Sequence, residues 1–366
     1  MPEGSTTPTE TAGAAAAPLP GVSVPGVGDL GHRGIKTALF ALKAGPLAIL
    51  VILVVVLSVL SDTFHSFENV GNVLTRSAVV SVLALGQLLV ILTRGIDLSV
   101  GSNVSLSAVV CVVVFRDTNS GWQAIVAAIA VGTLVGLVNG LLYVKGRLPH
   151  PFIATLAMLS VAAGLAQLVV HSKTVVGAPK IVDTLGDGRI KWVPGGSGPQ
   201  GWFPYATVVV VVVGLLTMVM LRRMVWGRWI YAVGGSPEAA QRTGIPIGAV
   251  LISVYVLCGL GAGVAAVLTV GKGDSASPFS GTGLELDAIA AVIIGGASFL
   301  GGRGKVVNAI TGALIIAVMH NGLNLLNIEA NWQNIAVGAI IVLAVEIDVL
   351  RRHLESRFRG IQARMS

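Results

Sequence analysis

The chain has 366 residues, of which 54% are hydrophobic and only 11% charged, and its mean hydropathy is +0.85. Soluble domains carry about 25% charged residues, so this composition excludes an ordinary soluble protein. The formal net charge of +7 does not indicate nucleic-acid binding, because the basic residues are scattered at the ends of apolar runs and form no stripe.

The first 36 residues are predicted to form a disordered cytoplasmic tail, because they are rich in Pro, Gly, Ala and Thr and contain no aromatic residue. They make a poor signal peptide, since the basic residues and the apolar run come only after residue 32. We therefore expect an uncleaved first span within a transmembrane domain over 37–352, followed by a cytoplasmic C-terminal tail over 353–366.

Ten apolar runs predict an all-α integral membrane protein. They cover residues 45–61, 74–93, 98–115, 122–144, 152–171, 204–222, 248–270, 287–302, 306–327 and 333–350. The eighth run is short enough for a re-entrant segment instead of a full crossing. With the N-terminus inside, seventeen of the 24 Lys and Arg residues fall on the cytoplasmic side, which predicts that both termini are cytoplasmic.

Charged residues interrupt the apolar sequence in "LLVILTRGIDLSVGSNVSL" (Leu88–Leu106), between the second and third runs. We expect a cytoplasmic turn here, in which Gly95 loosens the helix and Asp97 or Ser99 caps the next one. A local pair between Arg94 and Asp97 would lower the cost of desolvating both charges. The residues favour this structural interpretation over a role in gating or substrate contact.

The segment "GGSPEAAQRTGIPI" (Gly234–Ile247) predicts a short cytoplasmic helix over 237–243. Ser236 suits the N-cap, Pro237 the first helical position and Glu238 the positive end of the helix dipole. Gly244 and Pro246 are typical of a helix end. The residues alone leave open whether this helix docks a partner or only connects two spans.

Two glycine-rich stretches are predicted to serve packing. "GGASFLGGRGKVV" (Gly295–Val307) lacks the GxxxxGK[ST] spacing of a phosphate loop and is interpreted as a tight cytoplasmic turn. "CGLGAGVAAV" (Cys258–Val267) lies in an apolar run, where small residues allow close helix packing. Cys111 and Cys258 are interpreted as small buried apolar residues, with a disulfide as the alternative.

Polar residues within the apolar runs must find partners inside the membrane or line a wet path. They are Gln87, Asn103, Asn139, Gln167, His320, Asn321 and Asn324. Bonding between helices is the commoner role for such residues, and a solute path is the alternative. Glu285 and Asp287 are interpreted as solvated residues at a helix start, or as contacts for a partner. No metal site, and no nucleophile paired with a base, is predicted.

Several stretches resemble the permease subunits of ATP-binding-cassette (ABC) importers of the ribose, xylose and galactose group. They are "ILTRGIDLSVGS", "LVNGLLYVKGRLPHPFIATLAML", "YAVGGSPEAAQRTGI", "GTGLELDAIAAVIIGGASFLGGRGKVVNAITGALI" and "HNGLNLLNI", in order over roughly residues 45–350. The sequence departs at Arg94, where such permeases often carry a small residue. Its N-terminal tail and the loop over 172–203 also differ from that group of permeases.

The resemblance implies a ten-helix subunit that forms a homodimer, binds a cytoplasmic ABC ATPase and receives solute from an extracytoplasmic binding protein. It also implies that ATP and Mg are bound by the ATPase and not by this chain. The implied coupling helix comprises Gly235, Ser236, Pro237, Glu238, Ala239, Ala240, Gln241, Arg242 and Gly244. The implied signature turn comprises Arg94, Gly95, Asp97, Ser99, Gly101 and Ser102. The candidate translocation path comprises Gln87, Asn103, Asn139, Asn321 and Asn324.

The expected function is import of a pentose, hexose or related polyol across the cell inner membrane by alternating access, with no enzymatic activity in this chain. The alternative is an ion-coupled secondary carrier of a small polar solute. Such carriers usually need carboxylates in the middle of the membrane, whereas the acids here cluster at the ends of the apolar runs.

Overall fold

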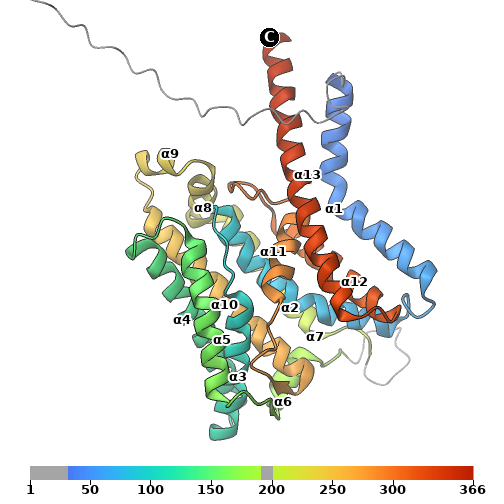
Figure 1. The fold of residues 1–366 in the computed structure, drawn as a ribbon, viewed down its shortest axis with the longest axis vertical. Helices are drawn as coiled ribbons and strands as arrows, with labels where there is room; N and C mark the ends of the chain where they lie inside the picture. Colours follow the sequence, from blue (N-terminus) through green and yellow to red (C-terminus); the bar gives the residue numbers. More distant parts are fainter. Residues whose placement is uncertain (1–31, 191–200, 366) are drawn as a thin grey trace, which may run out of the picture.

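The computed structural model describes residues 32–190 and 201–365, which are mostly helical (Figure 1). The helices are α1 His32–Leu60, α2 Phe67–Leu92, α3 Val100–Thr118, α4 Gly121–Lys145, α5 Pro151–Val169, α6 Lys180–Gly186, α7 Tyr205–Arg223, α8 Val225–Gly235, α9 Pro237–Arg242, α10 Ile247–Gly273, α11 Leu284–Ile294, α12 Val306–Leu325 and α13 Ala330–Met365. Strands β1 (Val175–Val176) and β2 (Ser275–Ala276) pair antiparallel. Most of the predicted tail, residues 1–31, lies outside the described residues, and α1 already begins within its last residues.

The all-α membrane class is confirmed, because eight helices within residues 32–190 and 201–365 are long and apolar enough to cross a membrane. They are α2, α3, α4, α5, α7, α10, α12 and the part of α13 from Ala330 to Ile347. The first predicted run forms a shorter apolar helix, Gly45–Leu60, within α1. The eighth run contains only α11, so a total of ten crossings stays a prediction.

The eighth predicted run is a broken element, not a continuous helix. After β2, the chain runs beside α3, where the Gly281 N–H donates to Ser105 Oγ over 2.9 Å. Helix α11 begins only at Leu284 and ends at Ile294, and residues 295–305 form a turn before α12. Gly296, Gly301 and Gly302 have φ angles of 83°, 79° and 69°. These are left-handed values that glycine adopts without strain, so the prediction of a glycine-dependent turn is confirmed.

Helix α10 is the centre of the packing and contacts α4, α2 and α3. A Cβ atom added to Gly132 of α4 would lie 2.5 Å from the Gly259 carbonyl oxygen of α10, and one added to Gly259 would lie 2.9 Å from the Gly136 Cα atom. The backbones of α4 and α10 therefore touch directly, which confirms the packing role of the "CGLGAGVAAV" stretch. Cys111 and Cys258 are both free and buried, as expected.

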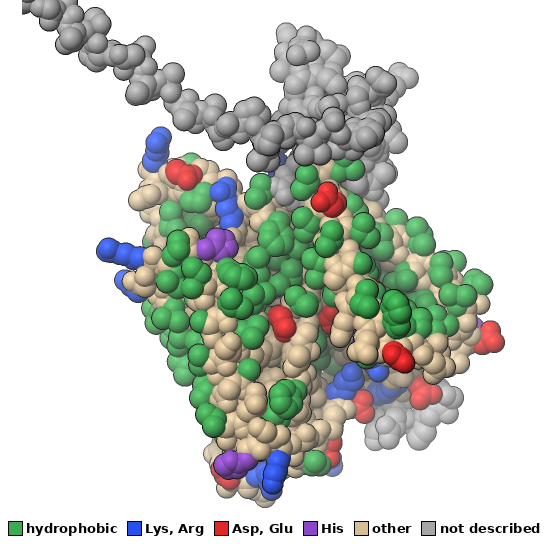
Figure 2. Space-filling view, in the orientation of Figure 1, with side chains coloured by type: hydrophobic (Ala, Val, Ile, Leu, Met, Phe, Trp, Pro, Cys, Tyr) green, Lys and Arg blue, Asp and Glu red, His purple; other side chains and the backbone are tan. Residues whose placement is uncertain are grey.

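Apolar side chains cover much of the outer surface, and Figure 2 shows them across the face between the two ends of the molecule. Leu168 of α5, Leu216 of α7 and Val59 of α1 are 72%, 66% and 79% exposed. A large apolar surface of this kind matches a hydrocarbon environment. Helices α9 and α6 lie at opposite ends of the bundle (Figure 1), and we call these the α9 end and the α6 end.

Two helices and one strand pair were missing from the sequence prediction. Helix α8 occupies the basic segment before α9, where its Trp226 indole N–H donates to Ser253 Oγ of α10 over 2.6 Å. Helix α6 and the β1–β2 pair lie in segments taken for loops. Each is short and packs against distant parts of the chain. None therefore produces a long periodic pattern in the sequence from which it could be predicted.

Candidate functional site

Helix α9 forms where the local sequence predicted it. Ser236 is its N-cap, and Ser236 Oγ accepts a hydrogen bond from the Ala239 N–H over 3.2 Å. Pro237 takes the first helical position and Arg242 the last, while Gly244 follows with a φ of 77°. The boundary agrees with the prediction of 237–243 to one residue, because capping and helix termination depend on neighbouring residues.

One face of α9 is anchored and the other is open. Ala240 is only 3% exposed and packs into the main core, whereas Glu238, Ala239, Gln241 and Arg242 are exposed. A hydrogen bond from its own backbone N–H and one from the Ser236 hydroxyl hold the pKa of the Glu238 carboxyl below its usual value. The charges of Arg94 and Arg242 lower this pKa further. Helix α9 therefore presents one negative and one positive side chain to solvent.

The signature turn begins with a helix-ending motif at α2. The Arg94 N–H donates to the Ile91 carbonyl over 3.0 Å, and the Gly95 N–H donates to the Val90 carbonyl over 3.0 Å. This is the Schellman pattern, in which the residue after the C-cap is usually a left-handed glycine. Here that position holds Arg94, with a φ of 67°. An arginine thus occupies a backbone position that suits glycine.

The predicted pair between Arg94 and Asp97 does not form, and this expectation was wrong. Arg94 Nε donates to the Gly234 carbonyl and Arg94 Nη2 to the Gly235 carbonyl, both over 2.7 Å. Asp97 is only 1% exposed and accepts from the Ser99 N–H over 2.9 Å and from the Ser99 hydroxyl over 2.6 Å. The chain turns inward after α2, so Arg94 reaches α8 while the Asp97 side chain lies in the interior.

Asp97 belongs to a buried polar group that we call the Asp97 cluster: Gln87, Asp97, Ser99 and Asn139. Asn139 Nδ2 donates to Ser99 Oγ over 2.8 Å. Gln87, with its amide oriented to satisfy both groups, accepts from the Asp97 N–H over 3.1 Å and donates to the Asp97 carbonyl over 3.3 Å. Ser99 is the N-cap of α3, but its side chain makes no capping bond. Asp97 accepts from the N–H of Ser99 itself and not from the first N–H groups of the helix, so the predicted cap by Asp97 or Ser99 was wrong.

The remaining residues of the turn explain its close packing. A side chain at Gly95 would approach the Tyr255 hydroxyl to 2.6 Å, and one at Gly101 would meet Gly281 and Glu285. Ser102 Oγ donates to the Ser99 carbonyl over 3.0 Å. Asn103 Nδ2 donates to the Gly132 carbonyl over 3.1 Å. Among the candidate path residues, Gln87, Asn103 and Asn139 therefore join helices in the interior.

A polar pocket opens at the α6 end, where α2, α10 and α12 converge near α6. Its volume is about 370 Å³, and it is lined by Asn69, Asn72, Thr75, Arg76, Asp187, Lys272, Asn321, Asn324 and Leu325. Asn69 and Asn321 donate to each other's side-chain oxygens over 3.0 and 2.8 Å. Of the candidate path residues, only Asn321 and Asn324 thus lie at this pocket. The other polar lining residues were missed, because four helices that are distant in sequence bring them together.

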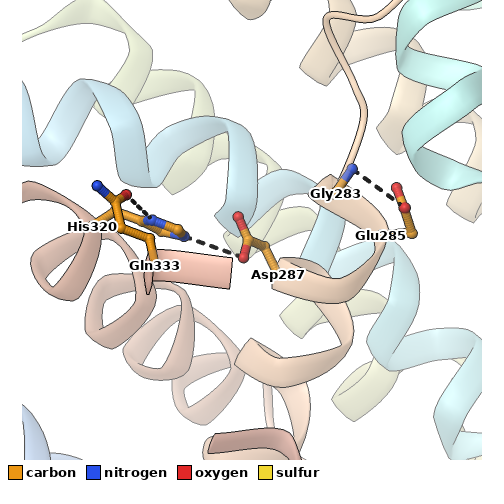
Figure 3. Close-up of polar contacts among 5 residues, drawn as sticks. All are labelled: Gly283, Glu285, Asp287, His320 and Gln333. Atoms are coloured by element: carbon orange, nitrogen blue, oxygen red, sulfur yellow. Dashed lines mark hydrogen bonds and ion pairs between the residues drawn. The ribbon is translucent and has the colours of Figure 1, made fainter. Parts of the chain in front are cut away.

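A second group of polar contacts joins α11, α12 and α13 (Figure 3). His320 lies between Gln333 and Asp287, with Nδ1 2.8 Å from Gln333 Oε1 and Nε2 3.3 Å from Asp287 Oδ1. Glu285 accepts from the Gly283 N–H over 3.3 Å. The expectation that Asp287 is a solvated residue was wrong, because its side chain is only 15% exposed and contacts His320.

Comparisons with known proteins agree with this architecture. The family described as "Branched-chain amino acid transport system / permease component" matches residues 69–345. The ribose import permease protein RbsC of Escherichia coli K12 is 38% identical over 286 residues, which cover 78% of this chain and 87% of that protein. The fructose import permease protein FrcC of Rhizobium meliloti is 36% identical over 282 residues, which cover 75% and 76%. A probable ABC transporter permease of Sinorhizobium fredii is 38% identical over 286 residues, which cover 77% and 82%.

No solved structure matches the chain. The family match spans the signature turn, α9, the pocket and most of the apolar helices. Permease components of ABC importers are transport subunits, not enzymes, and they work with an ATPase and a solute-binding protein. This protein belongs to the family of multi-pass inner-membrane permeases that serve ABC sugar importers.

Proposed function

We propose that this chain passes a pentose, a hexose or a related polyol into the cell as the membrane-spanning subunit of an ATP-driven importer. Two copies form the permease within the lipid bilayer, ten crossings per copy leave both termini in the cytoplasm, and residues 1–36 and 353–366 extend there. The structural observation that carries the proposal is the separation of α9 from the polar pocket, at opposite ends of the molecule. The ATPase drives one end while solute enters at the other.

The coupling role of α9 rests on its anchoring. A helix that is fixed through Ala240 and bounded by Ser236 and Gly244 moves as one unit when a partner pushes its open face. Gly235, Pro237, Glu238, Ala239, Gln241 and Arg242 complete the segment that we propose contacts the ATPase.

The chemistry of the pocket supports a hydroxylated solute. Amide, hydroxyl and charged side chains offer both donors and acceptors, and the lining holds four asparagines. Eight of the nine residues that line the pocket are polar or charged, unlike the mostly apolar linings of tight small-molecule sites. Weak, exchangeable hydrogen bonding suits a subunit that must release what it receives.

The proposal is tested by reconstitution in proteoliposomes with the partner ATPase and binding protein. Uptake of labelled ribose, fructose and a polyol is expected to require ATP and the binding protein, and to persist when ion gradients are collapsed. An Ala240→Pro variant removes the bond from the Ala240 N–H to the Ser236 carbonyl (2.9 Å) and breaks α9. We expect it to insert but to lose both ATPase binding and uptake. If this variant kept both ATPase binding and uptake, α9 would serve only to connect α8 and α10.

One observation keeps the ion-coupled carrier as a second candidate. Asp287 and His320 form a partly buried acid–base contact on helices that pack within the bundle, which is the kind of group that ion-coupled carriers use. Uptake that follows a proton or sodium gradient without ATP would establish this alternative and exclude the importer.

A further inference from the structure

The side chain of Arg94 joins two segments that lie 140 residues apart in the sequence. Its guanidinium donates to the carbonyls of Gly234 and Gly235, the last two residues of α8. The last carbonyls of a helix lack partners within the helix, and they attract a cation because the dipole is negative there. Because both bonds come from one planar guanidinium, they fix the orientation of Arg94 relative to α8 as well as its distance from α8.

Each end of this link has a defined neighbour. On the α8 side, Ser236 follows Gly235 directly and is the N-cap of α9. On the membrane side, Asp97 is the third residue after Arg94 and is held in the Asp97 cluster by Ser99. The link therefore stands between the start of the proposed coupling helix and the buried turn that begins α3.

The link is reinforced by the turn before α12. The Gly302 N–H donates to the Leu92 carbonyl over 2.9 Å, and a Cβ atom at Gly301 would contact the Arg94 side chain. Tyr231 of α8 also donates its hydroxyl to the Gly304 carbonyl over 2.8 Å. Three segments of the chain thus meet at one place, and Arg94 is the side chain that reaches from the first to the second.

The backbone of Arg94 shows that its side chain is retained at a cost. Its φ of 67° lies in the left-handed region, which glycine occupies without strain and a residue with a Cβ does not. Glycine at this position would complete the helix end equally well. The guanidinium, not the backbone, is what arginine adds here.

We propose that Arg94 is a positioning residue for transport, which transmits the movement of α9 to the Asp97 turn through its two bonds to α8. This inference rests on the proposed role of α9 as the ATPase-coupling helix. When the ATPase moves α9, the carbonyls of Gly234 and Gly235 carry Arg94 with them. The start of α3 then shifts together with α9.

The test uses the full complex in proteoliposomes and compares three variants. Arg94→Gly removes the guanidinium and relieves the left-handed backbone, and Arg94→Lys keeps the charge but loses the two-point geometry. Arg147→Gly is the matched control, because Arg147 is also an exposed arginine with a positive φ, 51°, in a turn between two long helices. The measurements are ATPase binding, ATP hydrolysis and the amount of solute transported per ATP hydrolysed.

We expect Arg94→Gly to bind the ATPase and hydrolyse ATP, but to transport roughly 2- to 30-fold less solute per ATP, which corresponds to a coupling energy of about 0.5–2 kcal/mol. Arg94→Lys is expected to fall between this variant and the unmodified protein, and Arg147→Gly to match the unmodified protein. Unchanged transport per ATP in Arg94→Gly would overturn the inference. So would loss of ATPase binding or of folded protein, because Arg94 would then only anchor α9. A failure of the proposed function would appear differently, as absence of ATP-driven uptake in the unmodified complex.

Discussion

Asp97 is a carboxylate in the interior of a membrane protein, where an unpaired charge is costly. Its Oδ1 accepts from both the Ser99 N–H and the Ser99 hydroxyl, and Asn139 Nδ2 lies 3.5 Å from it. The residue thus closes the turn into α3 from inside. At the scale of single residues, its role is set by these partners and not by the neighbouring Arg94.

Two substitutions at Asp97 separate structure from gating. Asp97→Asn keeps the size and an acceptor oxygen for Ser99, so we expect nearly normal folding and transport. Asp97→Leu leaves buried donors unpaired, at about 1–3 kcal/mol each, so the yield of folded protein should fall. Yield is measured by size-exclusion chromatography of detergent extracts. Normal yield with no transport in both variants would instead assign Asp97 to a gate.

The pocket at the α6 end allows a residue-scale test of the solute path. Asn324→Ala removes one amide from the lining, together with the bond that Asn324 Oδ1 accepts from Gln333 Nε2 over 2.7 Å. The loss of one hydrogen bond is worth about 0.5–1.5 kcal/mol, so we expect the KM for uptake to rise roughly 2- to 10-fold with the maximal rate little changed.

Gln123→Ala is the control for this test, because Gln123 is an exposed amide on α4 near the same end but does not line the pocket. An unchanged KM in Asn324→Ala would remove Asn324 from the path. Equal increases in both variants would point to a general effect of the α6 end.

At the scale of elements, the contact between α4 and α10 holds the bundle together through glycines. Helices that lack side chains at their crossing approach closely and gain dispersion contacts along their backbones. Gly132, Gly136 and Gly259 occupy this crossing, and the same helices carry Asn139 and Tyr255 toward the signature turn. The packing of α4 and α10 therefore also positions the Asp97 cluster.

Gly259→Leu should separate these helices. The added side chain has no space, and overpacking of this kind costs about 1–3 kcal/mol or more. We expect a large loss of folded protein, measured as the thermal transition of the purified sample. Gly164→Leu is the matched control, because nothing lies within 4 Å of a Cβ atom built at Gly164 of α5. Equal stability of the two variants would show that the close crossing is not required.

At the scale of the whole molecule, the two ends of the bundle define the direction of transport. Arginines and lysines concentrate at the predicted cytoplasmic ends of the apolar runs, and α9 is one of the exposed elements there. Figure 1 places α9 and α6 at opposite ends. If the bundle crosses the bilayer along this direction, one of these helices faces the cytoplasm and the other the outside.

Cysteine labelling tests that orientation. Lys180→Cys on α6 and Gln241→Cys on α9 place thiols at exposed positions, while the native Cys111 and Cys258 are buried. We expect a membrane-impermeant maleimide to label Cys at position 180 in intact cells and position 241 only in inverted vesicles. Labelling of both from one side would contradict the predicted topology.

Local chemistry in the sequence determined much of what was found. The low charge and the long apolar runs predicted a helical membrane protein. A segment that crosses hydrocarbon must pair its backbone N–H and C=O groups internally, and a helix does so. Ser236, Pro237 and Gly244 predicted α9 to within one residue, because caps act over a few neighbouring positions. The glycines around Gly301 predicted a turn because glycine adopts left-handed φ angles without strain, and those along α10 predicted close packing because they lack side chains.

Tertiary structure decided the contacts between distant segments. Arg94 and Asp97 are three residues apart and were expected to pair, yet one reaches α8 and the other is buried beside Ser99. The pocket joins Arg76, Asp187 and Lys272 from three separate helical regions. The apolar run at 287–302 carries only the short α11, because the chain leaves the helix after Ile294 and turns at Gly296, Gly301 and Gly302. Sequence spacing fixes which residues share a helix, but only the packing of helices against one another decides which polar groups meet.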